Sequence, residues 1–476
     1  MSYRHYEDDA HTDPIGYRVG EGTEFHRAVH GSDPRDTPPR RDRRHEAEPR
    51  AARQQEPEPR AARRSDAEAA GAGPREVGRS RAKTRQARAA KTRRRRGRIV
   101  GLVLGLVVLL ALAGGGYYVF DRLTGGPAAP DDYAAGNQGD SVVVRVHPGD
   151  TAEQIGAEAV EKGVVASTGA FMGAAVQNTS ISSVQPGYYL LPSNIPANLA
   201  VGALVDPSSR VGSVVISEGR QLHDARDVNT GAVKKGIYTL LSEASCIDTT
   251  GSGTPTCIGY DDFNAAGAVD DSSELGVPTW AADQVRGVPD RDRQLEGLIA
   301  AGSWDFDPTA QPGDILAQLV SESAQTYEGT GILDAGIKSG LDPYQTLVAA
   351  SLVERESLPN DFSKVARVIL NRLAAPQKLE FDSTVNYALD TTEVATTDAD
   401  RAAVTPWNTY AMEGLPATPI AAPSVGAVEA VETPADGDWL YFVTINRAGE
   451  TLFTRDYQEH LANIGKVEDG FLESGR

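Results

Sequence analysis

Residues 341–359 read Leu341-Asp-Pro-Tyr-Gln-Thr-Leu-Val-Ala-Ala-Ser-Leu-Val-Glu-Arg-Glu-Ser-Leu-Pro359, and this stretch predicts one long helix. Asp342 followed by Pro343 is typical of a helix N-cap with proline in the first turn, and Pro359 marks where the helix must end. At about 100° per residue, one face of this helix collects four apolar side chains. They are Val348, Ala349, Leu352 and Val353.

Glu356 falls at the centre of that apolar face, whereas Glu354 points to the far side, near Ser351 and Arg355. A carboxylate on the buried face of a helix costs free energy unless it is paired or used in chemistry. Partial burial also raises the pKa of a carboxyl group and keeps it protonated, as a general acid requires. The alternative is a structural glutamate in a buried salt bridge or a loop cap, and the helix alone favours neither.

Charge is distributed unevenly along the 476 residues, a length that accommodates two or three domains. Residues 1–98 hold 25 basic and 16 acidic side chains, whereas the remainder holds 22 basic and 50 acidic ones. The first 98 residues also contain few large apolar side chains, so they cannot bury a core and we expect a disordered tail. The chain is therefore predicted to join a basic arm to an acidic body.

The boundary between arm and body is Ile99–Phe120, a stretch of 22 residues without a charge that is long enough to cross a bilayer. Arg93-Arg-Arg-Arg-Gly-Arg98 precedes it, and the positive-inside rule then places the N-terminus in the cytoplasm and the body outside. A cleaved signal peptide competes, because Ala111-Leu-Ala113 resembles a cleavage site, but a whole signal usually has ~15–30 residues. We expect a single-pass membrane anchor at 99–120, followed by a linker at 121–140.

The two cysteines, Cys246 and Cys257, flank a loop rich in Gly, Thr and Ser on the expected outer side of the membrane. An oxidising compartment permits a disulfide between them, and two free thiols are the alternative. Closing so short a loop contributes about 3 kcal/mol in the chain-entropy model. No metal site is expected, because the chain has no further cysteine and no HExxH motif, and its eight histidines are scattered.

A small unit is expected at residues 141–212. Ser141-Val-Val-Val-Arg-Val146 predicts a strand, His147-Pro-Gly149 a turn, and Asp150-Thr151 a helix cap. This opening resembles LysM units, small β/α modules that in many proteins bind cell-wall glycans. Two alanine-rich helices and a second strand are expected to follow it, at 152–162, 167–177 and Gly187–Leu191.

A larger unit, residues 213–476, is predicted to mix helices and strands, so the fold class expected for the body is α+β. Val214-Val-Ile-Ser-Glu-Gly219 predicts a strand and a tight turn, and residues 246–292, rich in Gly, Asp and Pro, predict an inserted loop. Three further elements are expected: a helix within 314–337, a helix capped by Asn360-Asp361, and a hairpin that begins with a strand at 439–445.

Several motifs in this larger unit occur together in one order and spacing. They are Ala350-Ser-Leu-Val-Glu-Arg-Glu356, Val365-Ala-Arg-Val-Ile-Leu-Asn-Arg-Leu373, Asp382-Ser-Thr-Val-Asn-Tyr387, Asn408-Thr-Tyr410, Gly414-Leu-Pro416 with Pro419-Ile420, Leu440-Tyr-Phe-Val443, and Phe453-Thr454 with Glu459-His460. Together they resemble the endolytic murein transglycosylases, the MltG/YceG-like family of bacterial cell-wall lyases. Two departures are Ser383, where the family motif has proline, and Leu295-Glu-Gly297, which leads into Ala300-Ala-Gly-Ser-Trp304 instead of a Phe-Pro-Asp-Thr-Tyr-like segment.

The resemblance implies that Glu356, the second glutamate of the Glu-Arg-Glu triplet, is the catalytic acid. The implied reaction is endolytic cleavage of the MurNAc–GlcNAc bond of nascent peptidoglycan, which leaves 1,6-anhydro-MurNAc ends and suits the termination of glycan strands. Glu356 would protonate the bridging oxygen and then accept the proton of the muramyl C6 hydroxyl as it closes on C1. Because no water enters, neither a second carboxylate nor a cofactor is required.

Three polar side chains near these motifs are candidates for binding the substrate. Asn408 and Tyr410 carry amide and hydroxyl groups suited to N-acetyl groups and sugar hydroxyls, or they brace a loop. Asp382 is a candidate for stabilising developing positive charge, but a structural cap is the favoured interpretation.

Three more candidates have a structural alternative as well. Tyr387 either stacks on a sugar ring or packs in the core. Asn371 and Arg372 are expected to buttress the site, and Arg372 is suited to pairing with a carboxylate.

Two other functions remain open: a non-catalytic glycan-binding or cell-division scaffold, and a hydrolytic glycosidase, which would need a second facing carboxylate. The partners expected are glycan strands, the bacterial cell membrane that holds the anchor, and peptidoglycan synthases or division proteins beside an extracytoplasmic enzyme. No nucleic-acid partner is expected, because a basic run beside a membrane span typically orients the span and contacts anionic lipid.

Overall fold

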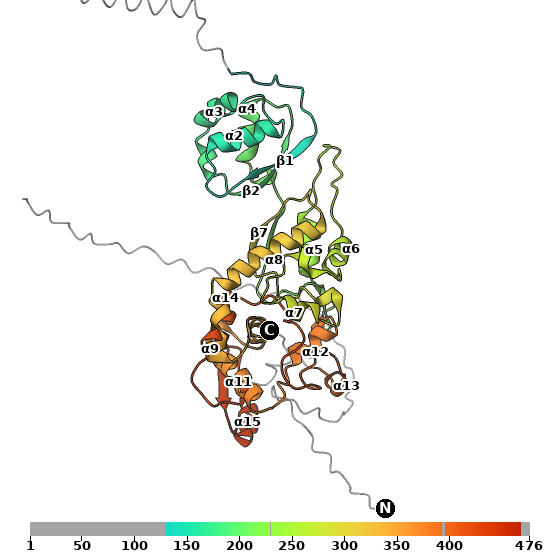
Figure 1. The fold of residues 1–476 in the computed structure, drawn as a ribbon, viewed down its shortest axis with the longest axis vertical. Helices are drawn as coiled ribbons and strands as arrows, with labels where there is room; N and C mark the ends of the chain where they lie inside the picture. Colours follow the sequence, from blue (N-terminus) through green and yellow to red (C-terminus); the bar gives the residue numbers. More distant parts are fainter. Residues whose placement is uncertain (1–129, 229, 393–395, 468–476) are drawn as a thin grey trace, which may run out of the picture. The chain divides into compact units, whose positions relative to one another are not determined.

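The structure, a computed structural model, describes residues 130–228, 230–392 and 396–467. The basic tail, the expected membrane segment and most of the linker lie outside these described residues. Within the described ranges, no helix is both long enough and apolar enough to cross a membrane. Helices and short strands are mixed along this part of the chain, and the fold is α+β (Figure 1).

Residues 141–211 form a small body around an antiparallel sheet with the strand order β1-β2-β3. Two helices connect β1 to β2, and the first of them begins with a capping box between Thr151 and Gln154. The predicted strand, capped helix, second helix and second strand are confirmed. The elements are β1 (Ser141–Val146), α2 (Ala152–Glu161), α3 (Thr168–Gln177), η1 (Thr179–Ser183), β2 (Gly187–Pro192), α4 (Ala197–Leu204), η2 (Pro207–Ser209) and β3 (Arg210–Val211).

The small body has a hydrophobic core that is formed by residues between Val144 and Leu204. Val144 and Leu191 enter it from the two main strands, and Phe171 enters it from α3. Helix α2 approaches α3 closely at Gly156, where a Cβ atom would lie 2.8 Å from the Phe171 ring. The packing of the two helices therefore depends on a residue without a side chain at this position.

The larger body, residues 213–467, distributes its described strands over three small sheets. Strand β4 pairs with β7, strand β5 pairs with β6 and, in parallel, with β8, and β9 forms a hairpin with β10. The predicted hairpin is confirmed. The strands are β4 (Ser213–Ile216), β5 (Ala225–Asp227), β6 (Val233–Lys234), β7 (Gly302–Asp305), β8 (Thr391–Thr392), β9 (Tyr441–Thr444) and β10 (Thr451–Thr454).

Helices supply most of the core of the larger body. The predicted helix within 314–337 is confirmed from Pro312 to Glu328, where a glycine follows it. The helices are α5 (Ile237–Ala244), α6 (Tyr260–Gly267), η3 (Ser272–Leu275), α7 (Ala282–Arg286), η4 (Arg291–Arg293), α8 (Pro312–Glu328), η5 (Ile332–Asp334), α9 (Gly336–Ser339), α10 (Pro343–Glu356), η6 (Pro359–Asp361), α11 (Phe362–Ala374), α12 (Asp382–Ala388), α13 (Asp398–Ala402), α14 (Val425–Glu432) and α15 (Tyr457–Ile464).

The prediction of an inserted loop at 246–292 is wrong, because this stretch contains helices α6 and α7. Phe263 from α6 and Val285 from α7 are fully buried in the core of the larger body. The carboxylate of Asp262 accepts a hydrogen bond from the Gly259 N–H and so begins α6. The high Gly and Asp content of residues 246–292 predicts a loop, whereas the short helices there are stabilised by one or two buried apolar side chains each.

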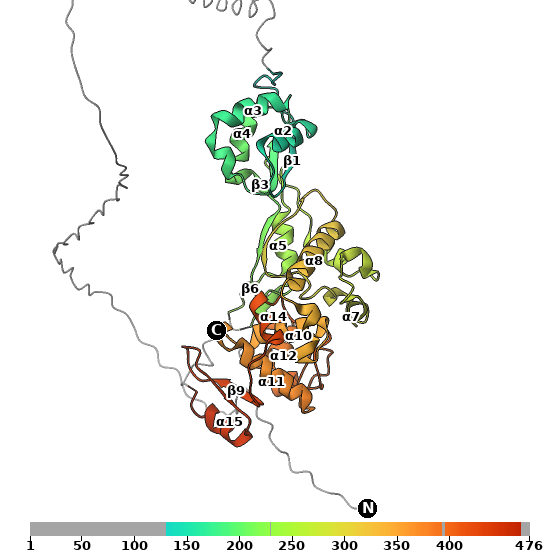
Figure 2. The same cartoon turned by 60° about the vertical axis from the view of Figure 1, so that its left-hand side comes forward.

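Helix α10 lies at the centre of the larger body, where it packs against α11, α12 and α14 (Figure 2). It is buried on nearly every side and not only along the predicted apolar face. Ser351 illustrates this: its hydroxyl is fully buried and accepts a hydrogen bond of 3.0 Å from the N–H of Ile420. Helix α10, which carries Glu356, is thus also the central helix of the larger body.

Candidate functional site

Helix α10 positions Glu356 through its own local signals. Asp342 caps the helix, its carboxylate accepts from the Gln345 N–H at 2.8 Å, and Pro343 occupies the first turn, as predicted. Glu356 is the last residue of the helix and is 7% exposed. The carboxyl group therefore lies at the edge of the core, at the end of a rigid element.

Ser383 contacts this carboxyl group from a second helix. Its hydroxyl donates a hydrogen bond to Oε1 of Glu356, and both side chains are buried. Ser383 is the second residue of α12, so the start of that helix is held against the end of α10. A donor on one oxygen restricts the rotation of the carboxyl group, which is what a positioned proton donor requires.

Asp382 begins α12 next to Ser383 and is also buried. Its carboxylate accepts hydrogen bonds from the hydroxyl of Thr396 and from Nε of Arg401, the latter at 3.2 Å. The Arg401 guanidinium lies over the ring of Tyr410, 5.3 Å from its centroid. Arg401 therefore contacts two predicted residues, Asp382 through an ion pair and Tyr410 through the face of its ring.

Two predicted binding residues are buried instead. Tyr387 is 1% exposed, and its ring packs edge-on against Trp407 with centroids 5.7 Å apart. Asn408 is also 1% exposed, and its amide donates to the carbonyl oxygens of Asp400, Arg401 and Ala403. The burial of Tyr387 fits the core-packing alternative, and the bonds of Asn408 fit the loop-brace alternative.

Asn371 and Arg372 hold the chain segment that leads into β9. The amide of Asn371 donates to the carbonyl oxygen of Trp439 at 2.8 Å. Arg372 is 0% exposed, and its guanidinium donates to the carbonyl oxygens of Leu440 and Leu379. These bonds go to backbone oxygens, so both side chains brace the fold at the end of α11.

Glu296 is a buried carboxyl group that the sequence interpretation passed over. It is 0% exposed, and the N–H of Leu222 donates to it at 3.2 Å. Burial raises its pKa to about 7, although the Leu222 N–H and the nearby Arg293 favour the charged form. The only sequence signal was its place in Leu295-Glu-Gly297, a motif that carries no burial information.

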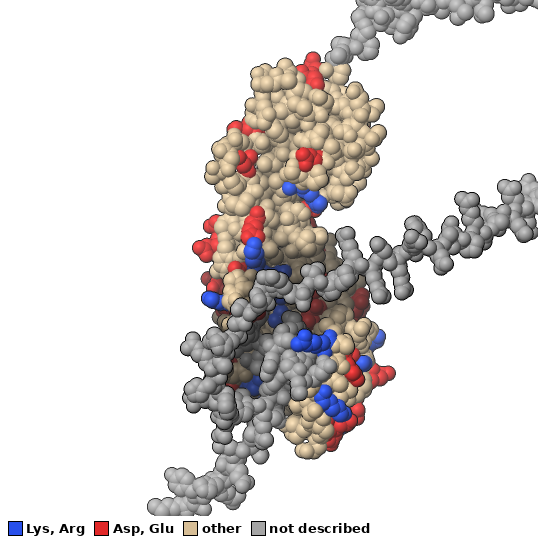
Figure 3. Space-filling model, turned by 180° about the vertical axis from the view of Figure 1, so that it is seen from behind, with Lys and Arg blue, Asp and Glu red and all other residues tan. Residues whose placement is uncertain are grey.

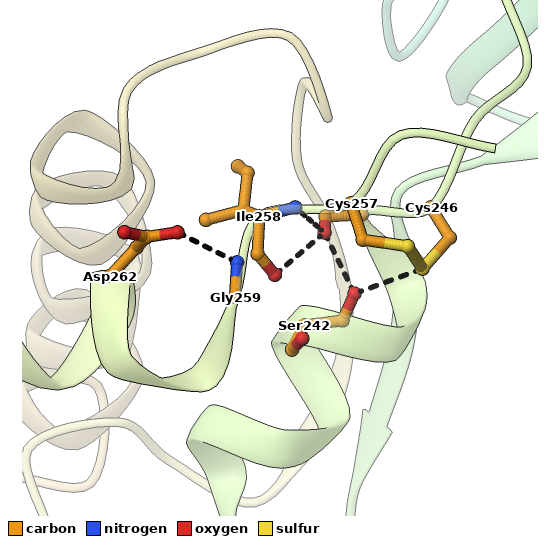
Figure 4. The surroundings of a disulfide bond; sticks show 7 residues. Ser242, Cys246, Cys257, Ile258, Gly259 and Asp262 are labelled. Carbon is orange, nitrogen blue, oxygen red and sulfur yellow. Dashed lines mark hydrogen bonds between the residues drawn. A yellow bond between two sulfur atoms is a disulfide. The ribbon is translucent and has the colours of Figure 1, made fainter.

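The structure joins Cys246 and Cys257 in a disulfide between the end of α5 and the start of α6 (Figure 4). Inside the loop that it closes, Ile247 and Thr256 exchange two backbone hydrogen bonds of 3.0 and 2.8 Å. The disulfide and this isolated bridge together hold the two ends of the loop at adjacent positions.

The fold and the site define a class: an α+β protein with a buried carboxyl group at the end of its central helix, oriented by a hydroxyl from a neighbouring helix. In the described part of the chain, no group of three side chains is arranged to hold a metal ion. The chain belongs to the YceG-like family, whose model matches residues 144–466.

Relatives of this chain carry one common name. This chain is 25% identical over 308 residues to the endolytic murein transglycosylase of Bacillus subtilis (strain 168). That match covers 63% of this chain and 76% of the Bacillus protein. It is 24% identical over 180 residues to the endolytic murein transglycosylase of Streptococcus pneumoniae (strain ATCC BAA-255 / R6), where the match covers 36% of this chain and 32% of that protein. The chain thus spans about a third of the Streptococcus protein.

Among solved structures, the chain is similar to a YceG-like protein from Listeria monocytogenes. The two are 22% identical, with a TM-score of 0.39, and the match covers 68% of this chain and 98% of that one.

Proposed function

We propose that this protein is an endolytic peptidoglycan lytic transglycosylase that cleaves the MurNAc–GlcNAc bond of glycan strands and leaves 1,6-anhydro-MurNAc ends. Its family and the name shared by its relatives support the reaction class. The single observation that carries the proposal for the site is Glu356, buried at the end of α10 and bonded by the Ser383 hydroxyl.

In this proposal, the carboxyl group of Glu356 protonates the glycosidic oxygen while positive charge develops on the muramyl ring. The resulting carboxylate then accepts the proton of the C6 hydroxyl, whose oxygen closes on C1. One group serves as acid and then as base, so the proton is returned and no water is consumed. A fixed carboxyl orientation favours both transfers, because each requires hydrogen-bond distance to a different oxygen.

The surroundings of Asp382 bear on the hydrolytic alternative. An inverting or retaining glycosidase uses a second carboxylate as base or nucleophile. Asp382 is the acidic residue on α12 next to Ser383, and it is paired with Arg401 and bonded by Thr396. A carboxylate held in this way is poorly suited to activating water, which supports the lyase over the hydrolase.

The experiment that tests this function is mass spectrometry of peptidoglycan digested by the full chain, wild type beside Glu356→Gln. We expect anhydro-muramyl ends from the wild type and a loss of about 10³-fold in their rate of formation in the variant, the scale of general acid–base catalysis. Reducing ends would instead establish hydrolysis. If the wild type binds glycan but does not cleave it, the protein is a glycan-binding or scaffold protein instead of an enzyme.

We also propose that the small body binds glycan as LysM-like units do. A cavity of about 260 Å³ lies between the turn after β1 and the η1 segment with the residues that follow it, and its lining includes His147, Asp150, Ile181 and Val184. Apolar walls with a few polar groups suit a sugar face. This proposal requires the Glu356→Gln chain to be retained on insoluble peptidoglycan without cleavage, and no retention would exclude it.

The proposed location is the outer face of the cell membrane, with residues 99–120 as anchor and residues 1–98 in the cytoplasm. The uncharged stretch and the arginines before it support this. If the chain still sediments with membranes after residues 1–120 are removed, the anchor lies elsewhere. Peptidoglycan synthases are the proposed neighbours, and a membrane pull-down without any synthase would count against them.

A further inference from the structure

Three basic side chains converge near the Glu356 site, and none of them has a carboxylate partner among the residues that the structure describes. The Lys234 ammonium donates to the carbonyl oxygen of Gly219 at 3.2 Å, and Nη1 of Arg355 lies 3.4 Å from the same oxygen. Arg220, the next residue in the chain, donates to the carbonyl of Lys235 at 2.7 Å. None of the three cations forms an ion pair with any residue in the described ranges.

The backbone turn at Gly219 brings the three cations together. Gly219 has a φ of +66°, which favours glycine, and its N–H donates to the carbonyl of Ala422 at 2.9 Å. This turn connects β4 to the segment before β5 and lies against the end of α10. Arg355 is the residue immediately before Glu356 and interacts electrostatically with its charge, although neighbouring side chains leave a helix in different directions. The three cations are therefore within electrostatic reach of the proposed acid.

The three neighbouring positive charges of Arg220, Lys234 and Arg355 repel one another. Desolvation, together with the charges of Arg355 and Arg220, lowers the pKa of the Lys234 ammonium to about 8. The Nε atoms of Arg220 and Arg355 are buried, and no acceptor among the described residues bonds them. Like charges held together with unused donors are costly unless an anion joins them.

The nearest carboxylates are engaged elsewhere. The charges of Glu356, Glu296 and Glu354 act on Arg355. However, Glu354 accepts from the backbone N–H and the hydroxyl of Ser424, at 3.0 and 2.6 Å. Glu356 accepts from Ser383 and Glu296 from Leu222. On the face drawn in Figure 3, basic side chains lie in separate small groups among acidic ones.

We propose that Arg220, Lys234 and Arg355 bind an oxyanion of the glycan strand and so set where the strand lies relative to Glu356. This inference rests on the proposed function. Arginine supplies planar paired donors and lysine a compact charge, a combination suited to a carboxylate or a phosphate. The two sources of such a group on a peptidoglycan strand are the carboxylates of its stem peptides and a phosphate at its lipid-linked end.

The test is the kinetics of the full chain, wild type beside Lys234→Met, with Lys235→Met as the matched control. Lys235 carries the same charge one residue away, but it pairs with Glu243 at 2.6 Å. We expect Lys234→Met to raise KM about tenfold with little change in kcat, the scale of one hydrogen bond to a charged group. Lys234→Arg should restore KM, and Lys235→Met should leave it unchanged. Equal KM values for wild type, Lys234→Met and Lys235→Met would overturn the proposal.

KM measured on a second substrate identifies which group of the glycan strand supplies the anion. If the tenfold difference disappears on strands stripped of their peptides by an amidase, the ligand is a stem carboxylate. If it persists on stripped strands only while they keep the phosphate end, the ligand is the phosphate, because the lactyl carboxylates that the amidase leaves on the muramyl residues are present on all stripped strands. Inorganic pyrophosphate tests the site without any reaction: it should raise the thermal midpoint of wild type and Lys234→Arg, but not that of Lys234→Met. This readout keeps its meaning even if the wild type forms no anhydro ends, and no shift in any variant would count against the site.

Discussion

The larger body contains two buried glutamates in different surroundings, Glu296 and Glu356. Glu296 lies between η4 and β7, is fully buried, and accepts from a backbone N–H. Its neighbourhood is aromatic, since burial and its charge raise the pKa of Tyr327 and Tyr344. Glu356 lies at the end of α10, retains 7% exposure, and accepts from a side-chain hydroxyl on another helix.

The difference separates a carboxyl group of the core from one that can meet a substrate. Complete burial raises the pKa of Glu296 to about 7, yet nothing the size of a sugar reaches a group with no exposed surface. Glu356 combines partial burial with a position at a helix end, where the chain turns toward η6. A perturbed pKa alone would therefore select the wrong glutamate, and access decides between them.

The largest effect expected from this comparison is on stability, at Glu296. The pKa of this group is about 7 in the folded chain and 4.5 for an unperturbed glutamate, so the folded state keeps a proton that the unfolded state releases. The contribution of the protonated Glu296 to folding stability is complete below pH 4.5 and is lost as the pH rises through 7. Over that window wild type should lose about 3 kcal/mol of unfolding free energy more than Glu296→Gln, which cannot titrate.

Urea unfolding followed by tryptophan fluorescence at pH 5 and pH 8 measures this difference. Glutamine keeps an oxygen for the Leu222 N–H, so the substitution changes the proton rather than the hydrogen bond. Glu356→Gln provides the comparison for activity, because it should lose cleavage. Parallel pH curves for wild type and Glu296→Gln would show that the buried group does not titrate between these values.

The extent to which the sequence predicts this arrangement differs between local and long-range features. The N-cap at Asp342, the position of Glu356 on the helix and the capped helix of the small body at Thr151 follow from neighbours within one or two turns, and the structure has all three. Local signals in these segments agree with the tertiary fold, which is why periodicity and capping sufficed.

What could not be predicted depends on packing between distant segments. The bond from Ser383 to Glu356 joins residues 27 positions apart, and the convergence of Lys234 and Arg355 on one carbonyl joins three separate segments. The burial of Tyr387 is likewise a property of the docked helix α12, because its ring meets Trp407 from a following loop. Side-chain type alone made Tyr387 and Asn408 look suited to sugar, and their burial became visible only in the fold.

The smallest effect expected is at Ser383, where the comparison can be sharpened. Removing its hydroxyl in Ser383→Ala should slow cleavage about fivefold, because one hydrogen bond contributes about 1 kcal/mol net and the carboxyl group of Glu356 stays in place. Ser383→Pro, which also removes the hydroxyl, should behave alike, since proline is tolerated in the first turn of a helix. Ser351→Ala removes a buried hydroxyl on α10 that bonds backbone only, so it should lower stability but leave the cleavage rate unchanged. A rate loss in Ser383→Ala as large as that of Glu356→Gln would mean that the hydroxyl takes part in the proton transfers themselves, whereas no loss would mean that this hydroxyl does not orient the acid.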